Sequence, residues 1–334
     1  MDVVTGISGL VGAHVALALL EHGRPVRGMV RQGSDRTIIR KIFNHYRRDG
    51  NVLFDRIEWA ETDLLDVVGL REAFTGAERV FHCAALVSMD ARDSRQLFAV
   101  NIGGTANVVN AALECGVKRL VHVSSIAATG RTPDGSPVSE DSPWVRDKHT
   151  SAYAISKFDA ELEVQRGVAE GLSAVMVNPG VVYGPGPKGR SSLSIIHRVS
   201  RGTAFYPTGS NGIVDARDVA AAMLKLADVG GDGERYILST DPVTYRDLFT
   251  MIAKAAGKPA PARALPQWVL ELAWRVEAVR TGLFGGRSLV TRNAVRSATS
   301  HYSYDTSKAR ALGITFRGPE ETIGNATAFY RAHH

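Results

Sequence analysis

Short apolar runs rich in valine and isoleucine alternate with longer helix-like stretches through the first two-thirds of the chain. Strands are predicted at Asp2–Thr5, Val26–Arg31, Ile57–Glu61, Arg79–Cys83, Leu120–Ser124, Ser173–Val177 and Arg235–Leu238, and helices at Leu10–Glu21, Leu65–Phe74, Val100–Cys115 and Ala152–Ala169. Strands that alternate with helices form right-handed βαβ units, which build a parallel sheet covered on both faces. We therefore expect an α/β fold with a doubly wound parallel sheet.

This regular alternation ends near Pro179. The glycine- and proline-rich segment Tyr183–Gly189 marks a boundary, because such residues favour turns. We expect residues 1–178 to form the sheet domain together with a return segment at about 213–239. The remaining residues, 179–212 and 240–334, are expected to form a smaller, discontinuous C-terminal lobe.

The composition is that of an ordinary globular protein, since 44% of the 334 residues are hydrophobic and 22% are charged. These values exclude a disordered or collagen-like chain. Cys83 and Cys115 are the only cysteines, and their spacing predicts neither a disulfide framework nor a metal site but suits a reducing, cytoplasmic setting. Residues Val3–Leu20 carry no charged side chain, yet glycines interrupt them and no basic leader precedes them. We therefore expect no signal peptide and no membrane span.

A glycine-rich loop accounts for the uncharged stretch Val3–Leu20 better than a signal peptide or a membrane span does. The segment Gly6–Gly12 has the spacing Gly-x-x-Gly-x-x-Gly and runs from the first strand directly into the first helix. In a dinucleotide site, glycines allow a tight turn, a close approach to the pyrophosphate and close helix–strand packing, and the helix N-terminus faces the phosphates. The residues expected to contact the cofactor are Thr5, Gly6, Ser8, Gly9, Leu10 and Gly12. Alternatively, the glycines only form a tight strand–helix turn.

The end of the second strand indicates which dinucleotide binds. An acidic residue there would accept a hydrogen bond from a ribose 2′-hydroxyl, but the strand ends in Arg31, followed by Ser34 and Arg36. Because a guanidinium can pair bidentately with a phosphate, the position favours NADP(H) over NAD(H). The alternative is that Arg31 stacks on the adenine or is only solvated.

The basic charge of the chain is concentrated in the same region. Eight basic residues and one acidic residue, Asp35, lie between Arg24 and Arg48, whereas the net charge of the whole chain is only +6. A cofactor phosphate accounts for the beginning of this cluster. The part from Arg40 to Arg48, which we expect to be helical, lies beyond its reach and leaves a second partner for that helix open. No helix-turn-helix, RNP or zinc signature accompanies the cluster, so we expect no nucleic-acid partner.

A second motif places acid–base chemistry on the helix Ala152–Ala169. Tyr153 and Lys157 are four residues apart and therefore share one helical face. A nearby ammonium lowers the pKa of a tyrosine from about 10 towards the useful range, and the lysine can also hold the nicotinamide ribose. Ser124 and Ser125 end the strand before this helix, at the edge of the sheet where ligands bind in such folds. The Tyr-x-x-x-Lys spacing alone is common by chance.

Together, these residues resemble the extended branch of the short-chain dehydrogenase/reductase superfamily, over essentially the whole chain. The resemblance implies a Rossmann NADP-binding domain and a substrate-binding C-terminal lobe. It also implies that Ser125, rather than Ser124, holds the substrate oxygen, that Tyr153 transfers the proton, and that Lys157 lowers the pKa of Tyr153. Further cofactor contacts that it implies are Asp63 and Leu64 at the adenine, Ala84 and Ala85 along the cleft, and Asn178 and Pro179 beside the nicotinamide carboxamide. The Asn101–Thr105 segment resembles a helix-start motif of this branch.

The resemblance is to the dihydroflavonol-reductase-like members of the NAD-dependent epimerase/dehydratase family. Asn178-Pro179 resembles the reductase version of its loop, and Ile126 and Ala127 stand where dehydratases carry an acidic pair. This implies a reductase of hydrophobic ketones or aldehydes, or the reverse oxidation of an alcohol. A nucleotide-sugar epimerase using NAD and a 3β-hydroxysteroid dehydrogenase-like enzyme remain alternatives. Arg217 either faces a substrate diphosphate or pairs with Asp215 or Asp218.

Two features of the branch bear on partners and substrate. Members commonly form homodimers through two helices per subunit, here Val100–Cys115 and Ala152–Ala169, although the apolar faces of these helices also suit packing on the sheet. Aromatic residues of the C-terminal half would suit a bulky hydrophobic substrate, or alternatively belong to the core. They are Trp144, Phe205, Tyr206, Trp268 and Trp274.

Overall fold

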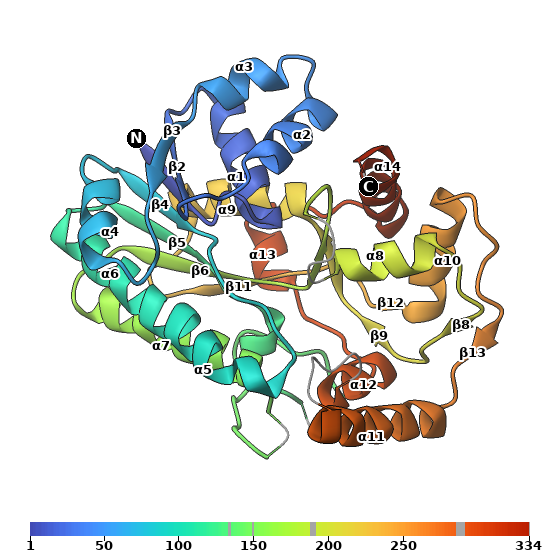
Figure 1. Ribbon diagram of the computed structural model, residues 1–334. Coiled ribbons are helices and arrows are strands. Elements are labelled where there is room, and N and C mark those ends of the chain that lie inside the picture. Colours follow the sequence, from blue (N-terminus) through green and yellow to red (C-terminus); the bar gives the residue numbers. More distant parts are fainter. Residues whose placement is uncertain (133–134, 149, 188–191, 285–290, 334) are drawn as a thin grey trace.

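A seven-stranded parallel sheet forms the centre of the residues that the computed structural model describes, which are 1–132, 135–148, 150–187, 192–284 and 291–333 (Figure 1). Its strand order is β11-β6-β5-β4-β1-β2-β3. The strands are β1 (Asp2–Thr5), β2 (Val26–Val30), β3 (Glu58–Glu61), β4 (Arg79–His82), β5 (Arg119–Val123), β6 (Ala174–Pro179) and β11 (Arg235–Leu238). Every neighbouring pair is parallel. The predicted doubly wound α/β fold is therefore confirmed.

Helices cover both faces of this sheet, which is why its central strands are apolar on both sides. On one face, Phe81 and Val121 pack in a cluster with residues of α1 (Leu10–Glu21) and α9 (Ala216–Val229). On the other face, Val80 packs in a cluster with residues of three more helices. These are α4 (Val67–Phe74), α6 (Gly104–Glu114) and α7 (Ala152–Ala169). Because all seven strands run in the same direction, their carboxyl ends lie at one edge of the sheet.

Helix α2 (Thr37–Tyr46) lies in the basic segment, where a helix was expected from Arg40 to Arg48, and α3 (Gly50–Asp55) follows directly after it. The many cations concealed a short apolar face, on which Ile39, Ile42 and Phe43 are fully buried. This segment is therefore part of the folded domain and packs beside α1.

The helix predicted at Val100–Cys115 begins earlier, and it contains a turn of the wider π-helical geometry. It continues from α5 (Ser94–Leu97) through a π-helical turn, Phe98–Gly103, into α6. Asn101 is therefore not at a helix start, and that prediction was wrong. Its side chain instead accepts from the backbone N–H of Leu86 at 2.7 Å and donates to the Leu86 carbonyl at 2.9 Å.

The C-terminal half adds a third apolar cluster around Tyr183, Ile196, Phe249 and Ile323. Its strands are β7 (Val181–Tyr183), β8 (Phe205–Tyr206), β9 (Ser210–Asn211), β10 (Ile213–Asp215), β12 (Val243–Thr244) and β13 (Arg263–Ala264), which form three two-stranded pairs. Its helices are α8 (Leu193–Ser200), α10 (Tyr245–Ala255), α11 (Gln267–Phe284), α12 (Arg292–Thr299), α13 (Ser307–Ala311) and α14 (Pro319–His333). The division into 1–178 with 213–239 and 179–212 with 240–334 stays a prediction.

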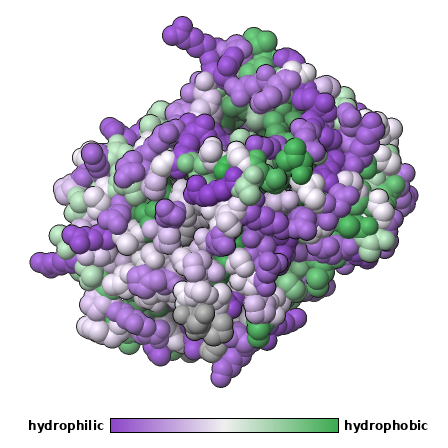
Figure 2. All heavy atoms as spheres, turned by 180° about the vertical axis from the view of Figure 1, so that it is seen from behind, coloured by the Kyte–Doolittle hydropathy of each residue, from purple (hydrophilic) through white to green (hydrophobic). Residues whose placement is uncertain are grey.

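Polar side chains cover much of the face seen from behind in Figure 2, and hydrophobic ones gather there in separate patches. Among the described residues, no helix is both long and apolar enough to cross a membrane.

Candidate functional site

The glycine loop after β1 can exist only with glycines at two of its positions. Gly6 has φ +66°, and a Cβ atom there would lie 2.6 Å from the Cα atom of Ala84. A Cβ atom at Gly12 would lie 2.4 Å from the Gly6 carbonyl oxygen. The first requirement brings the loop against β4, and the second brings α1 against the loop, as a dinucleotide-binding turn requires.

The N-terminus of α1 is open to an anion. Gly9 caps the helix without a side-chain hydrogen bond, and the first turn contains no acidic residue. The N–H groups of this turn therefore have no side chain that competes for them. Ser8 and Leu10 are half-buried beside them. These observations fit the pyrophosphate of a dinucleotide.

The other predicted cofactor contacts follow the carboxyl ends of neighbouring strands. Thr5 ends β1, Asp63 and Leu64 follow β3, and Ala84 and Ala85 follow β4. The Thr5 hydroxyl accepts from the N–H of Ala84 at 3.2 Å, which joins the glycine loop to β4, and the Asp63 carboxylate accepts from the Leu65 N–H at 3.0 Å. Leu64 is buried. The structure thus brings these residues to one edge of the sheet.

Arg31 lies directly after β2 and is exposed. Within the part of the chain that the structure describes, it has no carboxylate partner. Arg36, by contrast, pairs with Glu61 and lies over the Trp59 ring. Arg31 is therefore the cation of this strand end that is available to a phosphate.

Most of the basic segment beyond Arg31 is neutralised within the fold. Arg40 pairs with Asp55 at 3.0 Å and lies over the Phe54 ring, and Arg47 pairs with Asp49 at 3.0 Å. Arg40 and Arg47 thus pair within their own chain, whereas the question of a second partner stays open for the exposed Lys41 and Arg48.

The candidate catalytic helix α7 starts at Ser151, whose hydroxyl accepts from the N–H of Ala154 at 3.1 Å. This start places Tyr153 and Lys157 in the first two turns. Lys157 is only 1% exposed, and its Nζ donates to the Val123 carbonyl at 2.8 Å. Because Val123 ends β5, the ammonium lies at the same edge of the sheet as the glycine loop.

Burial raises the pKa of Tyr153, and the nearby Ser125 hydroxyl acts in the opposite direction. The Ser125 hydroxyl also accepts from the N–H of Ala127 at 3.1 Å. The predicted lowering of the Tyr153 pKa by Lys157 is not seen in this arrangement, because burial dominates and the ammonium is directed at the Val123 carbonyl. Burial also lowers the pKa of Lys157 to about 8, against the opposing charge of Glu161.

Sequence reasoning missed a layer of buried polar residues beneath this triad. His82 contacts the hydroxyls of Thr5 at 2.8 Å and Thr105 at 3.0 Å, and burial lowers its pKa to about 3. His122 is fully buried beside it, and its Nε2 lies 3.5 Å from the Lys157 Nζ. Strand alternation was a usable signal, since His82 and His122 are register partners on one face of the sheet.

The Asn178 side chain bonds to other groups of the protein interior, whereas the prediction was a contact with the cofactor. Its amide nitrogen donates to the Ser125 carbonyl at 3.0 Å and to Glu161 at 2.6 Å. Its contact with the nicotinamide carboxamide, like that of Pro179, stays a prediction.

Contacts within the fold bear on the roles that the sequence left open for Arg217 and for the aromatic residue Trp144. Arg217 pairs with Asp215 at 2.7 Å and with Glu321 at 2.9 Å, so its charge is neutralised within the fold. Lys188 and Arg190, which could also meet a diphosphate, lie outside the described residues. Trp144 stacks on Phe158 of α7 with ring centroids 4.4 Å apart.

The other aromatic side chains of the second half are not gathered at the site. Phe205 is 44% exposed and Trp268 is 69% exposed. The indole N–H of Trp274 donates to Glu271 at 2.9 Å. The structure thus does not bring these three side chains into one pocket, although a hydrophobic substrate had been expected to meet them.

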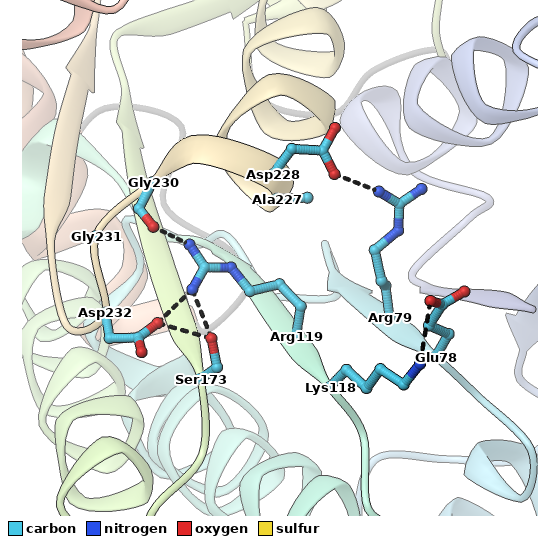
Figure 3. Close-up of a pocket in the computed structure, with 10 residues that line it drawn as sticks. All are labelled: Glu78, Arg79, Lys118, Arg119, Ser173, Ala227, Asp228, Gly230, Gly231 and Asp232. Atoms are coloured by element: carbon cyan, nitrogen blue, oxygen red, sulfur yellow. Dashed lines mark hydrogen bonds and ion pairs between the residues drawn. The ribbon is translucent and has the colours of Figure 1, made fainter.

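A hollow of about 640 Å³ lies at the opposite, amino edge of the sheet (Figure 3). Its lining is built mainly from charged residues that begin β4 and β5, such as Arg79 and Arg119, and from the loop after α9. These side chains bond to one another across the hollow, so we assign it to stability rather than to chemistry. Within the described ranges, no group of three or more His, Cys, Asp or Glu side chains is arranged to hold a metal ion.

Comparison with known proteins agrees with this geometry. Residues 3–239 match the model of the NAD dependent epimerase/dehydratase family. The chain is 32% identical to the putative dihydroflavonol 4-reductase of Synechocystis sp., over 99% of this chain and 94% of that protein. It is 31% identical to sterol demethylase protein B of Methylococcus capsulatus, over 98% and 97%. The crystal structure of gox2253 superposes with a TM-score of 0.81 at 32% identity, covering 100% of this chain and 98% of that one.

Proposed function

Because the chain belongs to the NAD-dependent epimerase/dehydratase family, we propose that it is an NADP-dependent reductase of hydrophobic ketones or aldehydes, similar to dihydroflavonol reductases. Members of the family are NAD(P)-dependent oxidoreductases and epimerases that act on alcohol or carbonyl groups, and this chain is such an enzyme. The observation that carries the proposal is the meeting of Ser125, Tyr153 and Lys157 beside the glycine loop.

The triad residues divide the proton chemistry among them. Ser125 holds the substrate oxygen by a hydrogen bond, and Tyr153 donates a proton to that oxygen in reduction or removes one in oxidation. Lys157 holds the nicotinamide ribose and keeps a positive charge near the forming tyrosinate. NADP(H), when bound, supplies or accepts the hydride. Acid–base assistance of this kind contributes roughly 100- to 10,000-fold to the rate, and orientation of the substrate contributes further.

The preference for NADP(H) rests on Arg31. Arg31 is exposed directly after β2 and has no carboxylate partner among the described residues, and Ser34 offers a hydroxyl nearby in sequence. A cation after the second strand suits the 2′-phosphate of the adenosine ribose. The family description names NAD, so the comparison of NADPH with NADH is the direct test of this preference.

The proposed substrate is a hydrophobic carbonyl compound bound by the lobe of residues 179–212 and 240–334. The names of the two full-length relatives refer to a dihydroflavonol and a sterol, both of which are fused-ring, largely apolar molecules. A nucleotide-sugar substrate is less well supported, because Arg217 is neutralised by Asp215 and Glu321. The cytoplasmic location and the homodimer stay predictions.

The test is oxidation of NADPH and of NADH with a panel of hydrophobic ketones and aldehydes, with Tyr153→Phe as the control. The proposal expects substrate-dependent consumption of NADPH in preference to NADH, and loss of that consumption in the variant. Unchanged activity of Tyr153→Phe would exclude the mechanism.

A second measurement addresses the alternatives. Protein that co-purifies with NAD and interconverts a nucleotide sugar without net redox change would be an epimerase. Oxidation of a 3β-hydroxysteroid with NAD, and no turnover of the carbonyl panel, would favour the 3β-hydroxysteroid dehydrogenase-like alternative.

A further inference from the structure

Glu161 is a buried carboxylate that the proposed mechanism does not use. It lies on α7 one turn after Lys157, and it is only 3% exposed. Burying an ionised carboxylate is costly unless it is paired and hydrogen-bonded, so its presence beside the candidate triad needs an explanation.

Its partners connect it to both sides of the triad. One carboxylate oxygen accepts from the Asn178 amide at 2.6 Å, and the same amide donates to the Ser125 carbonyl at 3.0 Å. The other oxygen faces the Arg235 guanidinium of β11 at 3.3 Å. On its own helix, Glu161 shares a face with Lys157, because the two are four residues apart.

We propose that Glu161 is a positioning residue for the candidate triad, whose buried carboxylate stabilises the Lys157 ammonium and, through Asn178, holds the backbone at Ser125. This inference rests on the proposed function, since it gives the triad a support that the reaction requires. A Lys157 side chain without this carboxylate would have only the Val123 carbonyl and the neutral His122 ring as partners.

The other groups around Lys157 do not replace this charge. His122 of β5 and His82 of β4 are neutral, because burial lowers the pKa of each. The Cys83 thiol after β4 is protonated, because burial raises its pKa. Tyr153 on α7 is likewise neutral. Burial raises the pKa of Glu161, and Arg235, which faces it from β11 at 3.3 Å, acts in the opposite direction and favours the ionised carboxylate.

The test compares Glu161→Gln with Glu163→Gln. Glutamine keeps the shape of glutamate and removes the charge. Glu163 lies two residues further along α7 and pairs with Arg166 at 2.9 Å, so its variant is a matched control on the same helix. The readout is the pH titration of the Lys157 Cε resonance in ¹³C-lysine-labelled protein, assigned by its absence from Lys157→Arg.

Lys157 loses its charge as the pH rises through its pKa of about 8. Removal of the nearby negative charge lowers this midpoint, and we expect a shift of about one pH unit in Glu161→Gln and none in Glu163→Gln. The alkaline limb of kcat moves to lower pH by the same amount, which corresponds to an approximately fivefold lower kcat at pH 8.

An unchanged Lys157 midpoint in folded Glu161→Gln overturns the proposal, even when activity is lost, because a merely structural residue would lower Tm without moving the midpoint. If Glu161→Gln does not fold, Glu161→Asp withdraws the charge by one methylene. A smaller shift in the same direction then supports the proposal, and an unchanged midpoint overturns it. Absence of carbonyl turnover in the wild-type protein would exclude the proposed function and leave this titration still decisive.

Discussion

Buried and half-buried cations have different partners at the two edges of the central sheet. At the amino edge, cations meet carboxylates. Arg79 pairs with Asp228 at 3.0 Å and Arg119 with Asp232 (Figure 3), and Arg79 also pairs with Asp2 at 2.9 Å. At the carboxyl edge, the Lys157 ammonium bonds to a carbonyl and to a neutral imidazole.

This difference separates stability from chemistry. A charge that is fully paired has little freedom to gain or lose a proton, whereas a buried and incompletely compensated group has a shifted pKa and can respond to a substrate. A hollow of about 640 Å³ lies at the amino edge, yet the titratable groups that suit catalysis lie at the other edge, where ligands bind in open α/β sheets.

The largest effect is expected from Tyr153→Phe at the carboxyl edge. The variant lacks the hydroxyl that transfers the proton, so kcat should fall by roughly 100- to 10,000-fold. Tm and the Kd for NADPH should change little, because the lost oxygen belongs to a half-buried side chain. Steady-state kinetics together with thermal unfolding and cofactor titration check this prediction. A variant that retains more than a tenth of wild-type kcat would remove Tyr153 from the proton transfer.

Much of the carboxyl edge could be predicted from the sequence, because its motifs are local. The glycine spacing and the Tyr153–Lys157 spacing each depend on one loop or one helix, and both follow from periodicity alone. The contacts beneath them could not be predicted, because they join residues far apart in the chain. The bond from Asn178 to the Ser125 carbonyl spans 53 residues, and the bond between Thr5 and His82 spans 77 residues.

The fold was predictable for a similar reason. Alternating strands and helices define the parallel sheet, so its seven strands were found with small errors at their ends. The packing of α2 was harder to foresee, because its apolar face has only three fully buried residues among many cations. The pairing of Arg40 with Asp55, 15 residues away, depends on how α2 and α3 pack, and sequence reasoning therefore left a partner open for the segment.

A stability effect without loss of chemistry is expected from Arg119→Met at the amino edge. Arg119 is only 8% exposed and donates to Ser173 at 2.7 Å and to the Leu226 carbonyl at 3.1 Å, besides its ion pair with Asp232. Loss of these charge-assisted hydrogen bonds should cost about 2–3 kcal/mol of unfolding free energy.

Denaturant unfolding measures this cost, and the adjacent Lys118→Met is its control because that side chain is 76% exposed. The kcat of both variants should remain close to wild type. A several-fold loss of kcat in Arg119→Met at unchanged cofactor affinity would mean that the two edges are not independent.

The two edges should also respond to acid in different pH ranges. Burial lowers the pKa of His82 to about 3, so its neutral form contributes stability above the unfolded pKa of about 6.5, and this is lost as the pH falls from there towards 3. Burial opposes ionisation of Asp2, but Arg79 and Arg24 outweigh it and lower its pKa. Its contribution is therefore present above about pH 4 and lost only below.

Tm measured between pH 7.5 and 3.5 distinguishes these contributions. The fall in Tm between pH 6.5 and 5 should be reduced by a few degrees in His82→Asn, and it should be unchanged in Asp2→Asn. An equal slope in wild type and His82→Asn over this range would show that protonation of His82 does not limit the stability of the carboxyl edge.

The smallest effect is expected from Arg31→Ala, because Arg31 is exposed and its loss unpairs no other group in the described part of the chain. The variant should raise the KM for NADPH about tenfold, which corresponds to about 1.4 kcal/mol, and should leave the KM for NADH and Tm unchanged. The selectivity in this measurement matters more than its size. An exposed cation that only attracts anions would change both cofactors alike, whereas a contact with the 2′-phosphate affects NADPH alone. If the KM values for the two cofactors changed equally, Arg31 would be an ordinary surface charge, and NAD(H) would be the expected cofactor.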